Sequence, residues 1–332
     1  MKNPIRYWHI VVFLCVGAYL LLNAATNTLR VYHWFTLLLV PAAMCSGERG
    51  RRFFLDWLPL FVFWISYDRL RLVQPLLLGR VAVKWPYDFE RRLFGWMSPG
   101  SVPPHAAREW MRAHSGSIWA DALFDLAQFV YLSQIFAVPA LMLLWWWLGN
   151  RRRQNQHHVI DGRKSPPEPG FDSGSAQPSE WYRHWFGRCL YAFTWLNAIG
   201  LAGYLLLPVA PPWWVTLHGM SQPTQSLIAT SRLSLAMDGR IVQGMIQTAP
   251  YWFGAVPSLH SAYPVLLALL GVNHLSRPAL IATVAYAVLM SVACVILNQH
   301  YVFDLLAGEL AAIVAWQLGT KSITKLSTNL RK

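Results

Sequence analysis

The chain has 332 residues and a formal net charge of +13, and it is 55% hydrophobic but only 13% charged, with 18 tryptophans. This composition excludes an ordinary soluble protein and indicates an integral membrane protein. The basic residues do not indicate a nucleic-acid partner, because they lie in short segments between apolar runs, where Lys and Arg orient a membrane protein and meet anionic lipid.

Apolar runs that are long enough to cross a bilayer, or nearly so, follow one another along the chain; a full crossing takes about 20 residues. They cover residues 7–23, 34–45, 53–67, 123–148, 189–207, 261–272, 278–297 and 302–318. The first run follows basic residues, as the apolar part of a signal peptide does, but it lacks a clear cleavage site, so we expect a retained helix. The pattern predicts an all-α, multi-pass membrane protein with about six to eight transmembrane helices.

The connections between these runs predict how the chain is organised. We expect a single membrane domain over residues 1–332 with both termini in the cytoplasm, because this orientation puts most short basic connections on the cytoplasmic side. Residues 150–187 include KSPPEPGFDSGSAQPSE and predict a flexible cytoplasmic linker, since their Pro, Ser and Gly content does not support a packed core. Residues 67–118 become an extracytoplasmic or interfacial segment, whose excess of Arg and Lys fits a face that gathers anionic headgroups.

Two histidines stand where polar turns lead into apolar runs. His260 lies in AVPSLHSAYP, and His300 lies in NQHYVFDLLAG together with Asp304. Asp304 follows His300 by four residues, so both side chains share a helix face if the helix begins at or just before the histidine. A carboxylate in this position can accept the Nδ1 proton of the imidazole and leave Nε2 as a nucleophile or base.

The helix predicted over residues 278–297 brings both histidines to the same face of the membrane, which we expect to be extracytoplasmic or lumenal. Ionisable residues at membrane depth are functional candidates, because their burial is costly without a partner or a use. Each histidine alone also has a structural interpretation: an interhelical hydrogen bond for His260, and helix capping or an interfacial contact for His300. The combination of both histidines with Asp304 favours a catalytic site.

The histidine motifs, in this order and spacing, resemble the second and third motifs of the type 2 phosphatidic acid phosphatase superfamily. More narrowly, YWFGAVPSLHSAYP, GYLLLPVAPPWW and DFERRLFG resemble segments of the inositol phosphorylceramide synthase catalytic-subunit branch. The resemblance covers roughly residues 67–308 and is densest towards the C-terminal end. It implies the six-helix membrane core of that superfamily.

The resemblance also implies a mechanism. His300, oriented by Asp304, is expected to attack phosphorus and form a phosphohistidine, while His260 protonates the departing alkoxide; no metal or cofactor is required. The implied reaction moves an inositol phosphate-like headgroup from a phospholipid to the hydroxyl of a ceramide-like lipid. The implied partners are therefore a phospholipid donor, a lipid acceptor and the membrane, and fungal members of the branch also work with a small regulatory subunit.

Two features of the broader superfamily are missing from this sequence: the first motif, KxxxxxxRP, and the Ser-Arg pair before the third-motif histidine. Other groups must then neutralise the phosphoryl oxygens, and a guanidinium suits this task because it grips phosphate through two hydrogen bonds. The candidate substrate-binding residues are Arg71 first, then Arg69, Arg80 and Lys84, together with Ser258 and Tyr301 beside the histidines.

Two other functions fit part of the pattern. A lipid phosphate or isoprenoid phosphate phosphatase would use the same site with water as the acceptor, and it differs from a transferase in whether the pocket excludes water while admitting a second lipid. An ion-coupled transporter also carries His and Asp within the membrane, but it is expected to show inverted repeats and broken helices, which this sequence lacks. The resemblance at branch level favours the transferase.

Overall fold

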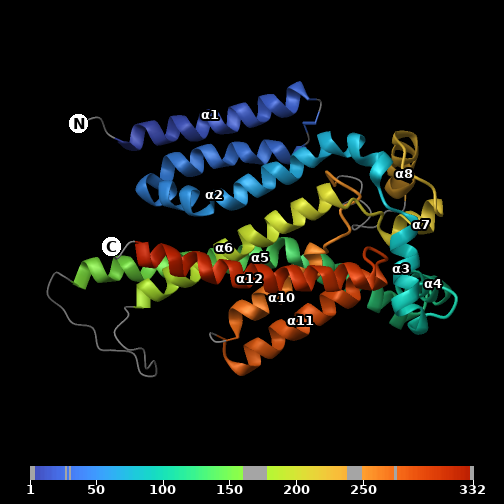
Figure 1. Ribbon diagram of the computed structural model, residues 1–332. Helices are drawn as coiled ribbons and strands as arrows, with labels where there is room; N and C mark the ends of the chain where they lie inside the picture. The colour runs from blue at the N-terminus through green and yellow to red at the C-terminus, as the bar shows by residue number, and fades with distance from the viewer. Residues whose placement is uncertain are drawn as a thin grey trace. The chain divides into compact units, whose positions relative to one another are not determined.

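The computed structural model describes residues 4–26, 28–29, 31–159, 178–237, 249–272 and 275–329. These residues form helices joined by short connections, and no β-strand occurs among them, which confirms the predicted all-α membrane fold (Figure 1). The elements are α1 (Pro4–Ala25), η1 (Val31–Leu38), α2 (Leu39–Leu77), η2 (Leu78–Arg80), α3 (Lys84–Phe94), η3 (Gly95–Met97), α4 (Pro103–Ala113), α5 (Ile118–Val159), α6 (Pro178–Leu206), α7 (Pro212–His218), α8 (Gln225–Met237), α10 (Leu259–Gly271), α11 (Arg277–Ile296) and α12 (Val302–Asn329).

The chain divides into two compact units, Met1–Arg71 and Leu72–Lys332. The first unit contains α1, η1 and most of α2, and its apolar contacts include Val12 and Val16 of α1 with Phe54 of α2. The second unit contains all the remaining helices. The organisation of residues 1–332 as a single membrane domain stays a prediction.

Three helices among the described residues are long and apolar enough to cross a membrane: Trp185–Leu206, Arg277–Ile296 and Val302–Lys321. A fourth crossing results if Ile118–Gln134 and Ala137–Leu144, which meet at a bend of 43°, form one span. The sequence predicts six to eight spans, which is more than the three or four helices of this length and hydropathy among the described residues. In the predicted linker, α5 continues to Val159 and α6 begins at Pro178, and residues 160–177 lie outside the described part of the chain.

Helix α12 is the centre of the second unit, where it packs against α6 and α10. Helix α5 packs against α6 and α11, and α10 packs against α11 (Figure 1). Two glycines allow α12 to come close to its neighbours: a Cβ at Gly308 would lie 2.1 Å from the carbonyl oxygen of Ser258, and one at Gly319 would lie 2.7 Å from the backbone nitrogen of Ala192. Small residues at helix contacts are typical of membrane bundles, because close backbone approach replaces the hydrophobic driving force.

Helices α3 and α4 have the pattern of helices that lie in a membrane interface. Trp85, Phe89 and Leu93 recur every four residues of α3, so they share one face, and each is more than two-fifths exposed. Trp110 of α4 is exposed as well. An apolar face with aromatic side chains and Arg or Lys on the other positions suits the headgroup layer of a bilayer.

Three connections that are distant in sequence are held together by their backbones. The N–H of Ala82 donates to the carbonyl of Pro208 at 2.8 Å, and the N–H of Ala210 donates to the carbonyl of Ala82 at 2.9 Å. The N–H of Val209 donates to the carbonyl of Phe253 at 2.8 Å. These contacts join the residues before α3, between α6 and α7, and before α10, so the first residues of those three helices are fixed at one end of the second unit.

Candidate active site

The two motif histidines and the motif aspartate lie together. His300 Nε2 is 3.4 Å from His260 Nδ1, and His300 Nδ1 is 3.5 Å from Asp304 Oδ2. His260 belongs to the first turn of α10, His300 to the α11–α12 turn (residues 297–301), and Asp304 to the first turn of α12. The structure therefore brings the three predicted catalytic side chains to one point; their roles in a reaction stay a prediction.

The α11–α12 turn is anchored on α7 through Asn298. Asn298 has a φ of 58°, a left-handed conformation that asparagine tolerates better than most residues. Its Nδ2 donates to the hydroxyl of Thr216 at 2.8 Å, and its carbonyl accepts the N–H of Trp213 at 3.1 Å. The residue two positions before His300 is thus tied to a helix from another part of the chain.

Asp304 has two structural tasks at the start of α12. Its Oδ2 accepts the N–H of Tyr301 at 2.9 Å, which satisfies a backbone donor that the helix leaves free, and the same oxygen faces His300. The 3.5 Å contact with the imidazole is longer than an ordinary hydrogen bond, as catalytic contacts often are before substrate binds. The carboxylate is fully buried, so its position is fixed by these neighbours.

Glu90 of α3 supports the same turn from a distance of more than 200 residues in sequence. Its Oε1 accepts the N–H of Val302 at 2.8 Å, and its Oε2 accepts the N–H of Phe303 at 3.2 Å. These are two of the donors that the first turn of α12 cannot satisfy itself. Burial raises the pKa of Glu90 to about 7, with a smaller contribution from the nearby Asp304, while the two backbone hydrogen bonds lower it.

His260 is held from both sides. Its ring stacks on Tyr131 of α5, with centroids 4.2 Å apart and planes 15° from parallel. The residues on either side of it are joined to α12, because the N–H of Ser258 donates to the carbonyl of Asp304 at 3.0 Å and the hydroxyl of Ser261 donates to the carbonyl of Leu305 at 3.0 Å. The starts of α10 and α12 are therefore locked to each other, and each carries one of the histidines.

The environment of His300 favours its neutral form. Burial lowers the pKa of His300 to about 4, and a hydrogen bond with the backbone of Ala255 acts in the opposite direction. A neutral imidazole whose Nδ1 proton points to a carboxylate has a lone pair on Nε2. In that tautomer the lone pair is on the nitrogen that faces His260.

Residues 183–318 match the PAP2 superfamily. This matched part of the chain is named the PAP2 domain after the superfamily that it resembles. It runs from α6 to α12 and contains both histidines and the aspartate of the site. Glu90 and Tyr131 lie before it in the sequence, so the segment ahead of the PAP2 domain contributes to the geometry of the site.

Three curated proteins are similar to the chain. A phosphoinositol dihydroceramide synthase of Bacteroides thetaiotaomicron is 25% identical, and the alignment covers 94% of this chain and 92% of that protein. The inositol phosphorylceramide synthase catalytic subunit of Schizosaccharomyces pombe is 25% identical over 39% of this chain and 31% of its own length. The inositol phosphorylceramide synthase of Candida albicans is 25% identical over 38% of this chain and 28% of its own length. No solved structure matches the chain. The PAP2 domain and these relatives identify the chain as a membrane enzyme.

The basic residues predicted to bind phosphate lie outside the PAP2 domain. In the first unit, Arg69 and Arg71 both contact the buried carboxylate of Asp68, with Arg71 Nη2 3.9 Å from Oδ1, and Arg69 also donates to Asn23. In the second unit, Arg80 Nη2 donates to the carbonyl of Leu206 at 3.5 Å. Lys84 is exposed at the first position of α3. Phosphate binding by these residues stays a prediction.

Ser258 and Tyr301, the other predicted substrate-binding residues, flank the histidines and are fully buried. Their hydroxyl oxygens have no hydrogen-bond partner among the described residues. The ring of Tyr301 stacks on Phe303, with centroids 5.6 Å apart, and packs against Val102. Their backbone N–H groups hold the site together, and a contact of their hydroxyls with substrate stays a prediction.

Two residues of the site were not predicted from the sequence: Glu90 and Tyr131. Glu90 belongs to DFERRLFG, a segment that the resemblance pointed to, but nothing in that segment marks its glutamate as buried. Tyr131 lies inside an apolar run, where a tyrosine is unremarkable. Within the described ranges, no cluster of three or more His, Cys, Asp or Glu side chains is arranged to hold a metal ion.

Proposed function

We propose that the chain transfers an inositol phosphate-like headgroup from a phospholipid to the hydroxyl of a ceramide-like lipid through a phosphohistidine at His300. The observation that carries the proposal is the 3.4 Å approach of His300 Nε2 to His260 Nδ1, with Asp304 behind His300. The similarity to a phosphoinositol dihydroceramide synthase over 94% of this chain supports the choice of donor and acceptor.

In the first half of the reaction, the lone pair of His300 Nε2 attacks the phosphorus of the donor phospholipid. A bond between Nε2 and phosphorus forms, and the bond from phosphorus to the diacylglycerol oxygen breaks. Protonated His260 gives its proton to that oxygen, so diacylglycerol leaves as a neutral alcohol. The negative phosphate next to His260 favours the protonated imidazole when the donor is bound, because an opposite charge raises the pKa of a histidine.

In the second half, His260 is neutral and acts as a base. It takes the proton of the acceptor hydroxyl, whose oxygen attacks the phosphorus and displaces His300 Nε2. The phosphorylated headgroup is then on the acceptor, His260 is protonated again and His300 is neutral, so the site has returned to its initial state. Asp304 Oδ2 faces Nδ1 of His300 and stabilises the positive charge that His300 carries in the intermediate.

The test uses the purified chain in lipid nanodiscs with phosphatidylinositol labelled in the inositol ring, with and without ceramide. We expect a labelled ceramide product from the parent protein, and a loss of at least about 100-fold in His300→Ala and Asp304→Asn, since the nucleophile or its orientation is removed. Quenching in alkali, which preserves the bond between histidine and phosphorus, followed by mass spectrometry should find inositol phosphate on the peptide that contains His300.

A matched control is His114→Ala, which removes an exposed histidine of the second unit and should leave turnover unchanged. Full activity in His300→Ala or Asp304→Asn would refute the proposed mechanism. Release of free inositol phosphate at the same rate with and without ceramide would show that the chain hydrolyses the donor lipid and does not transfer the headgroup. Activity of the purified single chain would also show that a regulatory subunit is not required.

A further inference from the structure

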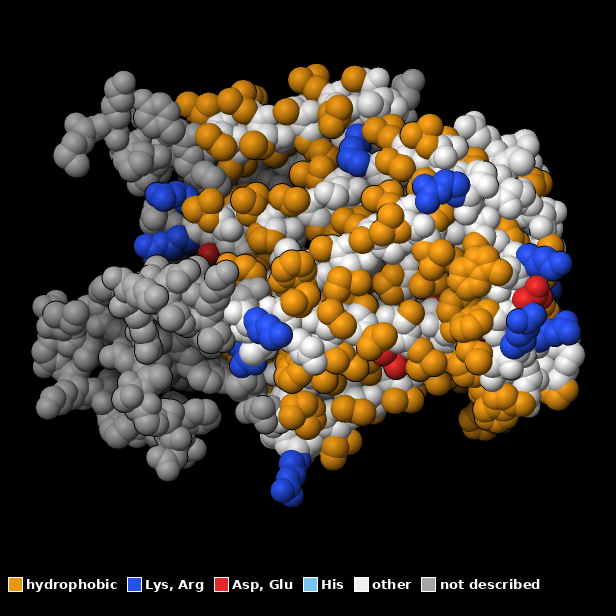
Figure 2. Space-filling model, viewed as in Figure 1, with side chains coloured by type: hydrophobic (Ala, Val, Ile, Leu, Met, Phe, Trp, Pro, Cys, Tyr) orange, Lys and Arg blue, Asp and Glu red, His pale blue; other side chains and the backbone are white. Residues whose placement is uncertain are grey.

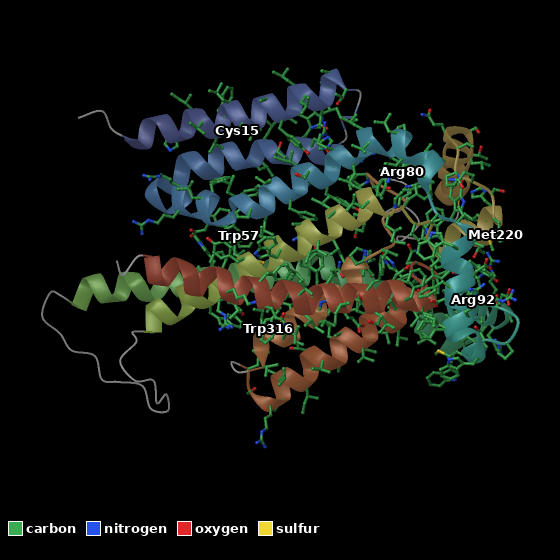
Figure 3. All side chains as sticks on the ribbon, viewed as in Figure 1. Cys15, Trp57, Arg80, Arg92, Met220 and Trp316 are labelled. Carbon is green, nitrogen blue, oxygen red and sulfur yellow. The ribbon has the colours of Figure 1, made fainter. Side chains whose placement is uncertain are left out.

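A cavity of about 330 Å³ lies between α3, α4 and α7, outside the histidine site. Its volume is at the lower end of the range for small-molecule sites, which is about 300–1,000 Å³, so it suits a headgroup better than a whole lipid. The cavity is lined by Tyr87, His105, Arg108, Glu109, Arg112, Val215, Thr216 and Met220. Figure 3 shows Met220 and, on α3, Arg92 at the same end of the second unit.

The charges around this cavity favour an anionic ligand. Arg108 and Arg112 are four residues apart on α4, so their guanidinium groups come from one face of the helix. Glu109 is the acidic residue of the lining, which leaves the cavity with a net positive charge. Figure 2 shows Lys or Arg and Asp or Glu side chains gathered at the end of the second unit where α3 and α4 lie in Figure 1. Guanidinium groups bind phosphate through charge-assisted hydrogen bonds.

The other polar groups of the lining suit a ligand with several hydroxyls. His105 Nε2 is 2.9 Å from the carbonyl of Pro212, and since a carbonyl only accepts, Nε2 must carry the proton. Burial lowers the pKa of His105, so the ring is neutral and its Nδ1 is an acceptor. With the carboxylate of Glu109, this nitrogen gives the lining acceptors for hydroxyl donors beside the two guanidinium groups. A quaternary ammonium headgroup would instead be favoured by an aromatic cage without these cations.

Residues that line the cavity also contact the α11–α12 turn. Thr216, which lines it, accepts the hydrogen bond of Asn298, two residues before His300. Tyr87, also in the lining, packs against the cluster of Val102, Tyr301 and Phe303 on the other side of the turn. A ligand in the cavity would therefore lie next to the residues that carry the nucleophile, at the level of the interfacial helices α3 and α4.

We propose that this cavity binds the anionic polyol headgroup of the donor phospholipid, with Arg108 and Arg112 on its phosphate or hydroxyl oxygens. This inference rests on the proposed function and names the determinant of headgroup specificity for the same reaction. It assigns a use to the excess of basic residues in the segment 67–118. It also predicts selectivity for an inositol phosphate headgroup over a choline phosphate headgroup.

The experiment measures binding without turnover, by isothermal titration of the protein in phosphatidylcholine nanodiscs. The probes are glycerophosphoinositol, inorganic phosphate and glycerophosphocholine. We expect glycerophosphoinositol to bind to the parent protein and to His300→Ala, and to bind about tenfold more weakly to Arg112→Gln and to Arg108→Gln, because each loses a charge-assisted hydrogen bond. The matched control is Arg91→Gln with Arg92→Gln, two exposed arginines of α3 outside the cavity lining.

Unchanged binding in both single variants, with melting temperatures equal to that of the parent, would overturn the proposal. Equal affinity for inorganic phosphate and glycerophosphoinositol would also overturn it, because the polyol would then contribute nothing. Because Arg112 is exposed, its replacement is not expected to prevent folding. The binding experiment and the transfer assay distinguish the two proposals. If the parent protein binds glycerophosphoinositol but does not transfer a headgroup, the proposed function fails and the cavity assignment stands. If the parent protein transfers the headgroup but the arginine variants bind as tightly as the parent, only the cavity assignment fails.

Discussion

At the scale of single residues, the site combines side chains that a sequence reveals with two, Glu90 and Tyr131, that it does not. The relation of His300 to Asp304 is local, since four residues separate them, and the pattern predicts their contact directly. Glu90 accepts a hydrogen bond from Val302, which is 212 residues away in the sequence, and the residues around Glu90 have the pattern of an ordinary amphipathic helix. Its burial follows only from how α3 is placed against α12, which local pattern does not encode.

Glu90 is a positioning residue, and its replacement tests this role. We expect Glu90→Ala to lower kcat by about 10- to 100-fold, because two buried N–H groups lose their acceptor and the first turn of α12 no longer holds His300 and Asp304 in place. The KM for phosphatidylinositol should stay within about twofold, since Glu90 does not line the headgroup cavity. Steady-state kinetics in nanodiscs gives both values.

Glu90→Gln is the conservative variant for this test. Its amide oxygen can still accept a backbone N–H, so most of the kcat should return. A glutamine variant as inactive as the alanine variant would show that hydrogen-bond acceptance is not what Glu90 provides. A rise in KM with unchanged kcat would contradict the positioning role as well.

At the scale of elements, the sequence predicts the helices of the PAP2 domain closely where proline or a polar turn marks their ends. The run predicted over residues 278–297 is α11 (Arg277–Ile296), because Pro278 is a favourable residue for a first helical turn. Helix α5 extends to Val159, beyond the predicted end at residue 148, because the polar residues that follow the apolar run are compatible with a helix. Hydrophobicity marks where a helix can cross a membrane, and it does not mark where the helix ends.

The close approach of α12 to α10 depends on Gly308. We expect Gly308→Ala to lower stability by about 3 kcal/mol, because the added Cβ would lie 2.1 Å from the carbonyl oxygen of Ser258 and the backbone must move apart. The same shift would displace His260 from His300, so lipid transfer should also fall. Thermal unfolding of the detergent-solubilised variant measures the first effect.

Gly79→Ala is the matched control, since a Cβ at Gly79 has no neighbour within 4 Å. It should unfold at the parent temperature and keep full activity. A Gly308→Ala protein as stable and as active as this control would mean that the contact between α10 and α12 tolerates a wider spacing.

At the scale of the whole molecule, the second unit places its chemistry at one end. Helices α3, α4 and α7 and the α11–α12 turn lie at that end, and the C-terminal end of α12 lies at the other (Figure 1). The sequence predicted that residues 67–118 and the histidines share a face, from the alternation of membrane crossings and loop charge. It could not predict that α3 and α4 pack beside the α11–α12 turn, because that packing joins segments some 200 residues apart.

The predicted orientation can be tested by labelling single cysteines with a membrane-impermeant maleimide in a background without native cysteines. Ser115→Cys, after α4, and Lys321→Cys, near the end of α12, are both exposed positions. We expect Ser115→Cys to react in intact bacterial cells, and Lys321→Cys to react only after the cells are permeabilised. The reverse pattern would put the site on the cytoplasmic face, and labelling of both in intact cells would refute the predicted number of crossings between them.

The contact between the two imidazoles has a consequence for the enzyme when no lipid is bound. In the proposed mechanism the phosphorus atom lies about 3–3.5 Å from His300 Nε2 before attack, and His260 Nδ1 is at a similar distance, 3.4 Å, from the same nitrogen. Under the proposed mechanism, the lipid-free protein therefore keeps its nucleophilic nitrogen in contact with His260. A donor lipid must then separate the two rings when it binds, and the histidine that it displaces is the one proposed to supply the proton.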